Sequence, residues 1–382
     1  MSWISKAAKN AEEILSLAYQ HQNALSERPS LLMDLPKKLS GDFKYFVAKL
    51  AHRDIPVVLD SYQDLKHSVL YLDTNGDGHL SDEKGYSAQL IKHRGFSGEE
   101  YRFGPVSVEV RDIERKEETK FYAKTYNGRQ LFLFPAAYHV GKARLGKNAY
   151  KVAVIDGNFD GRYDKLFSPP VERLWSPGCD SFAIDLNGDG RFNHNYYSRD
   201  TELMPLSMMV QMKGAYYSVG IAPDGTALEL KKAEPKFGTL DLGGAKVKLK
   251  LWSDAAAQYR FYLEKNWQLP AGKYAAIFME LHKRDSSGNE WNFNSSRKKC
   301  KLDDFEIRPG ETTSFEIGPP FQIKTTAEQS SNTMSICFDL EGQAGELYSP
   351  GARRNDRRIS EPGFKIIDES GKALESGRFK YG

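Results

Sequence analysis

The chain has 382 residues, a formal net charge of +3, 12% aromatic residues and 40% apolar residues. A chain of this length is too long to fold around one ordinary hydrophobic core, so it predicts two domains. The apolar side chains are numerous enough to form a core in each domain. The nearly balanced charge does not indicate a nucleic-acid or anionic-membrane partner. A mean hydropathy of −0.58 and the lack of a long apolar run exclude a transmembrane helix.

The N-terminal segment, residues 1–41, carries apolar side chains at helical spacing over residues 4–25. Ile4, Ala11 and Leu15 are among those that can share one broad face of a helix. The pattern therefore predicts an N-terminal amphipathic helix, which either docks on the first domain or serves as a stalk.

Residues 42–240 read as a β-rich domain. Apolar and polar residues alternate along short stretches of the chain, as at Val106, Val108 and Val110. Turn signals such as Asn127-Gly128 separate one stretch from the next. Such runs are typical of strands joined by hairpins. We expect a mostly antiparallel domain here.

This domain contains the phrase Asp-x-Asn-x-Asp-Gly three times, each time directly after a short apolar run. We name residues 73–81 loop 1, residues 156–164 loop 2 and residues 185–193 loop 3. Calcium takes about six to eight oxygen ligands, and loops of this design supply them from positions 1, 3, 5, 7 and 9. The predicted ligands are therefore Asp73, Asn75, Asp77, His79 and Ser81 in loop 1; Asp156, Asn158, Asp160, Arg162 and Asp164 in loop 2; and Asp185, Asn187, Asp189, Arg191 and Asn193 in loop 3.

The other loop positions fit the same design. The seventh residue would bind through its backbone carbonyl, so the side chains of His79, Arg162 and Arg191 are not expected to be ligands. The sixth residue is glycine because the chain turns sharply there. The eighth residue is apolar in every loop and is expected to anchor the loop in the protein. Loop 2 has three carboxylates, against two in each of the others, and is the strongest predicted site.

These windows resemble the calcium loops of EF-hands, dockerins, thrombospondin type 3 repeats and integrin propellers, which implies bound calcium. Position 12 departs from an EF-hand, and the strand-like flanks favour the integrin kind of loop. The missing carboxylate would come from Asp82 or Glu83 for loop 1, and from Asp180, Asp200 or Glu202 for loop 3. Loops 2 and 3 are expected at the same edge. The alternative is that the Asn-Gly and Asp-Gly pairs are ordinary hairpin turns that bind no metal.

Residues 241–382 read as a second domain after a Pro- and Gly-containing seam at 234–244. Roughly seven to nine short strand-like runs with regular turn signals predict a β-sandwich. The stretches LPAGKY (269–274) and RPGETTSFEI (308–317) resemble phrases of bacterial immunoglobulin-like domains. That resemblance implies an immunoglobulin-like fold and no particular activity.

The cysteines and the N-terminus bear on the compartment. Cys179, Cys300 and Cys337 match no zinc or thioredoxin spacing, and three free thiols are the favoured interpretation. A bridge between Cys300 and Cys337 in an oxidising compartment is the alternative. The first twenty residues lack the apolar core of a secretory signal. Extracellular calcium modules, however, work where calcium is abundant. We therefore expect an exported protein (periplasmic, cell-surface or secreted) whose leader has been removed.

Motifs of catalysis are missing from the sequence. It contains no HExxH pair, nucleophile elbow, P-loop or dinucleotide fingerprint. The basic clusters at 297–301 and 353–358 are interpreted as solvated rims of the second domain, and contact with an acidic polymer is the alternative. The sequence thus predicts a non-catalytic, calcium-stiffened adhesion, scaffold or binding module for a glycan or protein ligand, with no nucleic-acid partner. The alternative is a calcium-dependent hydrolase of polysaccharide or peptide, with catalytic carboxylates that the sequence does not identify.

Overall fold

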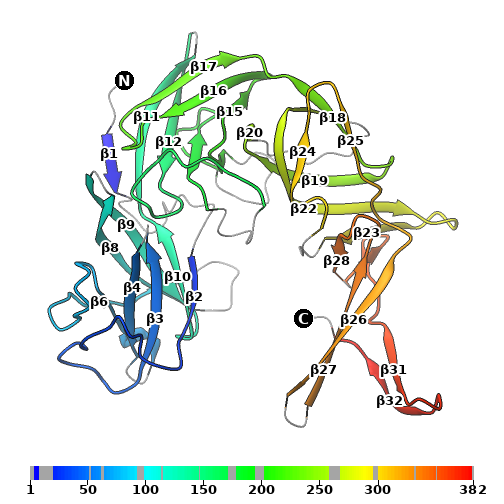
Figure 1. The fold of residues 1–382 in the computed structure, drawn as a ribbon, viewed down its shortest axis with the longest axis horizontal. Coiled ribbons are helices and arrows are strands. Elements are labelled where there is room, and N and C mark those ends of the chain that lie inside the picture. Colours follow the sequence, from blue (N-terminus) through cyan, green and yellow to red (C-terminus); the bar gives the residue numbers. More distant parts are fainter. Residues whose placement is uncertain are drawn as a thin grey trace. The chain divides into compact units, whose positions relative to one another are not determined.

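The computed structural model describes residues 4–7, 20–50, 53–61, 64–92, 99–112, 115–145, 147–170, 178–193, 202–257, 267–295, 300–330, 333–349 and 351–380. These residues are mainly β-strands, and the helical element among them is the 3-10 turn Leu65–His67 (Figure 1). No helix in these ranges has the length and apolar character needed to cross a membrane. The chain divides into two compact units, Met1–Ala233 and Glu234–Gly382, and each is described by itself.

The predicted N-terminal helix is wrong. Ile4–Ala7 (β1) and Gln20–Asn23 (β2) are strands, and residues 8–19 lie outside the described residues. β1 pairs with residues 137–140 and β2 pairs with residues 130–133. Both segments gain backbone hydrogen bonds from partners far away in the sequence, and this tertiary pairing outweighs the helical spacing of their side chains.

The described residues of unit 1 form four sheets in which neighbouring strands pair antiparallel, which confirms the β-rich prediction. The first has the order β1–β11–β12–β13–β14, with β11 Ala137–Leu145, β12 Asn148–Ile155, β13 Ser181–Ile184 and β14 Leu203–Pro205. The second has the order β2–β10–β9–β8–β7, with β7 Gln89–Ile91, β8 Glu100–Asp112, β9 Arg115–Thr125 and β10 Gln130–Pro135. The third has the order β3–β4–β5–β6, with β3 Phe43–Leu50, β4 Arg53–Asp60, β5 Val69–Leu72 and β6 Tyr86–Ser87. In the fourth, β16 Ala215–Ile221 lies between β15 Met209–Met212 and β17 Leu228–Ala233.

One core cluster of unit 1 joins its second and third sheets. Phe46 and Val57 of the third sheet and Phe103 and Phe121 of the second are fully buried in one cluster. This follows from the alternation of apolar residues along the strands, which directs every second side chain inward. Phe159 of loop 2 belongs to the same cluster, with its ring edge-on to Phe121 at a centroid distance of 6.2 Å.

Unit 2 is also built of sheets around a separate core. Its core cluster includes Val247, Trp267, Tyr274 and Tyr348. The strands are β18 Phe237–Asp241, β19 Lys246–Ser253, β20 Ala256–Ala257, β21 Trp267–Pro270, β22 Gly272–Arg284, β23 Glu290–Asn294, β24 Phe305–Ile307, β25 Thr312–Ser314, β26 Gln322–Ser330, β27 Thr333–Glu341, β28 Leu347–Tyr348, β29 Arg353–Arg354, β30 Arg357–Arg358, β31 Gly363–Ile367 and β32 Ala373–Arg378. The β18–β25 pair is parallel, whereas the other strand pairs described in this unit are antiparallel.

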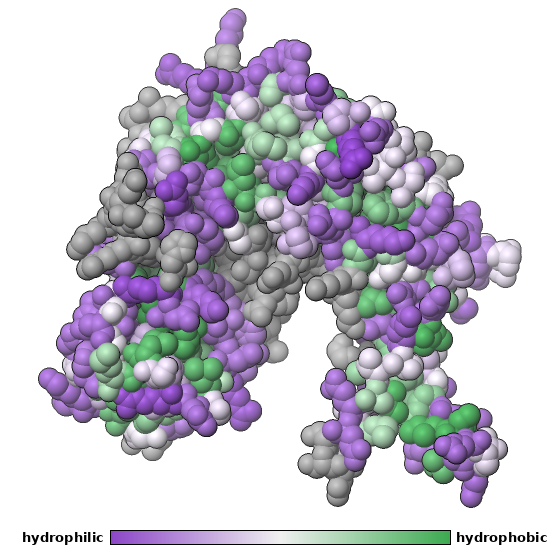
Figure 2. All heavy atoms as spheres, viewed as in Figure 1, coloured by the Kyte–Doolittle hydropathy of each residue, from purple (hydrophilic) through white to green (hydrophobic). Residues whose placement is uncertain are grey.

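Some apolar side chains of unit 2 remain on its surface. Ile323, Met334, Ile367 and Leu374, which lie on the hairpins β26–β27 and β31–β32, are exposed. Figure 2 shows apolar residues gathered on these C-terminal hairpins. The cysteines form no bridge in the described residues: Cys179 is a buried free thiol, Cys300 is half-buried and Cys337 is exposed.

Candidate calcium loops

Each of the three loops begins where a strand ends. Loop 1 follows β5, loop 2 follows β12 and loop 3 follows β13. The first aspartates, Asp73, Asp156 and Asp185, are only 4%, 1% and 5% exposed. The strands therefore carry a carboxylate into the protein at the start of every loop, and a buried carboxylate needs hydrogen bonds or a counter-charge.

The three loops share one pattern of hydrogen bonds. The carboxylate at position 1 accepts the backbone N–H of the sixth-position glycine, and the carboxylate at position 5 accepts the backbone N–H of position 7. The first distance is 3.1 Å for Asp73–Gly78, 3.0 Å for Asp156–Gly161 and 2.9 Å for Asp185–Gly190. The second is 2.8 Å for each of Asp77–His79, Asp160–Arg162 and Asp189–Arg191.

The third-position asparagine completes this pattern. Its side-chain oxygen accepts the backbone N–H of position 5, at 2.9 Å in loop 1, 3.4 Å in loop 2 and 2.8 Å in loop 3. The backbone thus curls around the oxygen-bearing side chains of positions 1, 3 and 5. The sixth glycines have φ of 81°, 77° and 80°, which a Cβ would penalise.

A further carboxylate from outside each nine-residue window holds the second residue of that loop. Glu83 accepts Thr74 N at 2.6 Å, Asp180 accepts Gly157 N at 3.0 Å and Glu202 accepts Leu186 N at 2.7 Å. Glu83 and Glu202 are among the residues that the sequence predicted as the missing carboxylates of loops 1 and 3. Asp82 receives only a long contact of 3.4 Å from Asn75 Nδ2, and Asp200 lies outside the described residues.

Asp180 hydrogen-bonds to loop 2, whereas its position in the sequence suggested that it would serve loop 3. β12 and β13 are antiparallel, with Ile155 opposite Ser181 and Val152 opposite Ile184. Asp180 therefore lies beside the start of loop 2, and loop 3 leaves from the other end of β13. The prediction that loops 2 and 3 share one edge is wrong, because antiparallel neighbours end in opposite directions. The two ends of β13 are roughly 10 Å apart for a strand of this length.

Loop 2 is the most buried loop. Asp156 and Asp180 are both buried, and Asp156 also accepts Thr119 Oγ1 at 3.1 Å. Burial, with repulsion from Asp160, raises the pKa of Asp156 to about 7. Burial, with repulsion from Asp156, raises the pKa of Asp180 to about 9. A cation bound between these buried carboxylates would offset their negative charges and so remove the repulsion.

The ninth-position carboxylate of loop 2 is occupied by a neighbour. Arg162 donates to Asp164 from Nε at 3.1 Å and from its terminal nitrogen at 2.9 Å. Asp164 is therefore bound by a cationic side chain in this conformation. The oxygen donors that remain in loop 2 are those of Asp156, Asn158 and Asp160 with the backbone carbonyl of position 7, a set of hard oxygens that suits calcium.

Loop 1 is closed by Asp34, which sequence reasoning missed. Asp34 accepts Leu80 N at 2.7 Å, Ser81 N at 3.1 Å and Ser81 Oγ at 2.7 Å, and it contacts His79 Nδ1 at 3.0 Å. These bonds, the one from His79 first, lower the pKa of Asp34, and the same contact raises that of His79. Asp34 lies in the connection before β3, so no local motif signals its role.

Loop 3 is open to solvent. Residues 187–191 are exposed, and a Cβ on Gly188 or Gly190 would meet nothing within 4 Å. Lys151 Nζ donates to the backbone carbonyl of Gly190 at 2.7 Å, and Glu202 accepts Asn193 N at 2.9 Å. The eighth-position anchors follow the same trend: Leu80 and Tyr163 are buried, and Phe192 is half-buried.

Within the described ranges, no three His, Cys, Asp or Glu side chains converge as a ready-made metal cluster. A cation in these loops would therefore depend on asparagine and backbone oxygens as well as carboxylates. No family model, no curated protein and no solved structure matches this chain.

Proposed function

We propose that this is a calcium-binding, non-catalytic protein that acts outside the cytoplasm as an adhesion, scaffold or binding module. The observation that carries the proposal is the shared conformation of the three loops, each curled around a buried aspartate and held by a second carboxylate from outside. Simple hairpin turns require neither a buried first aspartate nor an added carboxylate.

The ion would be held by the side-chain oxygens of positions 1, 3 and 5 and by the backbone carbonyl of position 7. In loop 2 these are Asp156, Asn158 and Asp160 with the carbonyl of Arg162. Calcium supplies positive charge there and performs no chemical step. This chain's own residues shape the loop: Phe159 anchors it in the core, and Asp180 holds Gly157 N and Lys165 N at 3.0 and 2.7 Å.

Two further parts of the proposal concern compartment and fold. Export follows from the argument that calcium loops of extracellular modules fill only at about 10⁻⁴–10⁻³ M calcium. We also propose that unit 2 is an immunoglobulin-like sandwich, on the strength of its many short antiparallel strands around one apolar core.

The calcium-dependent hydrolase remains the alternative, but no observation favours it. Among the described carboxylates, those whose pKa is raised are Asp156 and Asp180. Both are buried: Asp156 lies in loop 2 and Asp180 lies beside it, and both accept backbone N–H groups of residues 157–165. A pair of catalytic carboxylates would instead have to reach a substrate.

The test is thermal unfolding of the whole protein in EGTA and in about 5 mM calcium, with magnesium as the control. For a dissociation constant near 10⁻⁴ M, one filled loop adds about 2 kcal/mol to the folded state and raises Tm by roughly 5 °C. Elemental analysis of the purified protein would show calcium. Equal Tm values in EGTA, magnesium and calcium, with no calcium in the protein, would overturn the proposal.

A further inference from the structure

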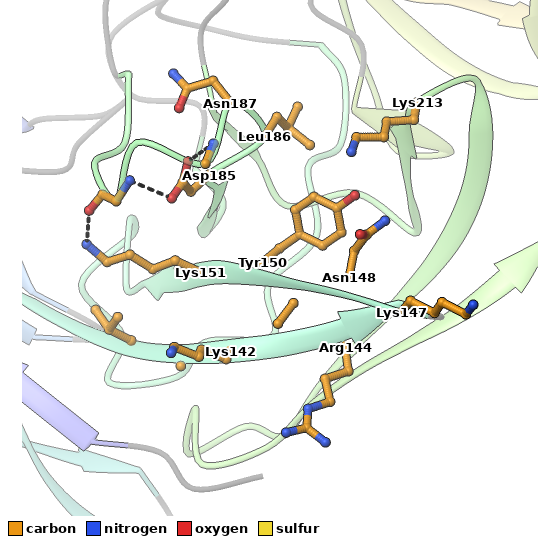
Figure 3. Close-up of a pocket in the computed structure, with 15 residues that line it drawn as sticks. Lys142, Arg144, Lys147, Asn148, Tyr150, Lys151, Asp185, Leu186, Asn187 and Lys213 are labelled. Carbon is orange, nitrogen blue, oxygen red and sulfur yellow. Dashed lines mark hydrogen bonds between the residues drawn. The ribbon is translucent and has the colours of Figure 1, made fainter.

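A basic hollow lies beside loop 3 in unit 1. The β11–β12 hairpin extends beyond β13, because β13 pairs only with residues 152–155 of β12. Loop 3 and the β15–β16 turn, which carries Lys213, border this extension (Figure 3). Together they line an open hollow of about 1140 Å³.

Five cationic side chains line this hollow: Lys142, Arg144, Lys147, Lys151 and Lys213. Lys142 and Lys151 are direct cross-strand partners, an arrangement of like charges that destabilises a sheet. Within the described residues none of the five forms an ion pair with a carboxylate. The acidic residue of the lining is Asp185, whose two oxygens accept Gly188 N and Gly190 N. The hollow therefore carries an excess of positive charge that local partners do not offset.

Two of the ammonium groups are held in place by aromatic rings. Lys213 Nζ lies 5.3 Å from the ring centroid of Tyr150, and Lys151 Nζ lies 4.7 Å from that of Phe192. Figure 3 shows Tyr150 between Lys151 and Lys213. Such cation–π contacts orient the charges before a ligand arrives. Tyr150 is itself buried, so its ring offers little face on which a nucleic-acid base could stack.

We propose that this hollow binds an acidic polysaccharide, a carbohydrate chain that bears carboxylate or sulfate groups. The positive charges are spread along a hairpin and a neighbouring turn and do not converge on one point. This arrangement fits a chain with repeated negative charges better than a single small anion. The burial of Tyr150 disfavours a single-stranded nucleic acid, whose bases need an open ring face for stacking. The inference deepens the proposed function and rests on it, since it names the ligand of a non-catalytic binding module. A cation in loop 3 would add positive charge to the same rim.

The experiment measures binding of fluorescently labelled dextran sulfate to the full chain by anisotropy, with uncharged dextran of equal length as the control probe. Lys142 and Lys147 are exposed, so K142E/K147E tests the hollow. K37E/K38E, which reverses two exposed lysines elsewhere in unit 1, produces the same change in net charge. We expect K142E/K147E to weaken binding about tenfold and to reduce the slope of log Kd against log salt by roughly two. K37E/K38E should stay within about twofold of the wild type.

Several outcomes would overturn the proposal: equal weakening by both variants, no weakening by either, or binding of single-stranded DNA that is as tight and as sensitive to K142E/K147E. A Tm measurement checks that each variant is folded, and K142A/K147A replaces the charge reversal if it is not. All titrations are repeated in EGTA. If calcium proves to be absent from the protein, the contrast between the two variants in EGTA still decides whether the hollow binds the polyanion.

Discussion

Loops 2 and 3 have the same motif and share three internal hydrogen bonds, yet they lie in opposite environments. Asp156, Phe159 and Tyr163 of loop 2 are buried, and the buried carboxylate of Asp180 lies against the loop. Residues 187–191 of loop 3 are exposed, and Lys151 supplies a positive charge at its rim. The motif determines the local curl of the chain, whereas the surroundings determine how much a cation would stabilise it. We expect loop 2 to be the structural loop and loop 3 to be the accessible one.

The largest expected difference in stability between variants of loop 2 and loop 3 comes from replacing their aromatic side chains. Phe159→Ala would empty a fully buried site in the core of unit 1 and should lower the free energy of unfolding by about 3–5 kcal/mol. Phe192 of loop 3 is only half-buried, so Phe192→Ala should cost about 1 kcal/mol or less. Urea unfolding followed by far-ultraviolet circular dichroism, which reports on the strands of both units, measures both losses. Similar losses for the two variants would contradict the difference in burial.

The second expected difference in stability comes from replacing a glycine in each of the two loops. A Cβ on Gly157 would lie 2.5 Å from the backbone oxygen of Cys179, whereas a Cβ on Gly188 would meet nothing within 4 Å. Gly157→Ala must therefore displace backbone and should cost about 2–3 kcal/mol. Gly188→Ala suffers only from its φ of 79° and should cost about 1 kcal/mol. The same urea titrations compare them, and a Gly188→Ala loss as large as that of Gly157→Ala would refute this explanation.

A smaller expected difference in stability appears only when calcium is present. Asp160 repels the buried Asp156, so Asp160→Asn should leave Tm unchanged or slightly higher in EGTA. In about 5 mM calcium the same variant should lose roughly 1–2 kcal/mol relative to wild type, because a charged ligand is missing. Asp189→Asn in the exposed loop 3 is the control and should change little in EGTA. An Asp160→Asn effect of the same size and sign in both buffers would mean that loop 2 holds no ion.

Much of the local structure follows from the sequence alone. Alternating apolar residues predicted antiparallel strands, and the Asp-x-Asn-x-Asp-Gly windows predicted sharp turns with a glycine at positive φ, which Gly78, Gly161 and Gly190 show. These features depend on residues within a few positions of one another. Hydrogen bonds from a side chain to the backbone a few residues further on need no distant partner, so a short window contains the information.

Tertiary structure decided the rest. The helical spacing of residues 4–25 was outweighed at both described ends by pairing with β11 and β10. Antiparallel pairing of β12 with β13 assigned Asp180 to loop 2 and separated loops 2 and 3. The cations of the basic hollow are spread between Lys142 and Lys213, and no charge run marks them in a sequence with a net charge of only +3. The physical reason is the same each time: strand pairing joins residues far apart in the chain, and the charge and burial of a site depend on those partners.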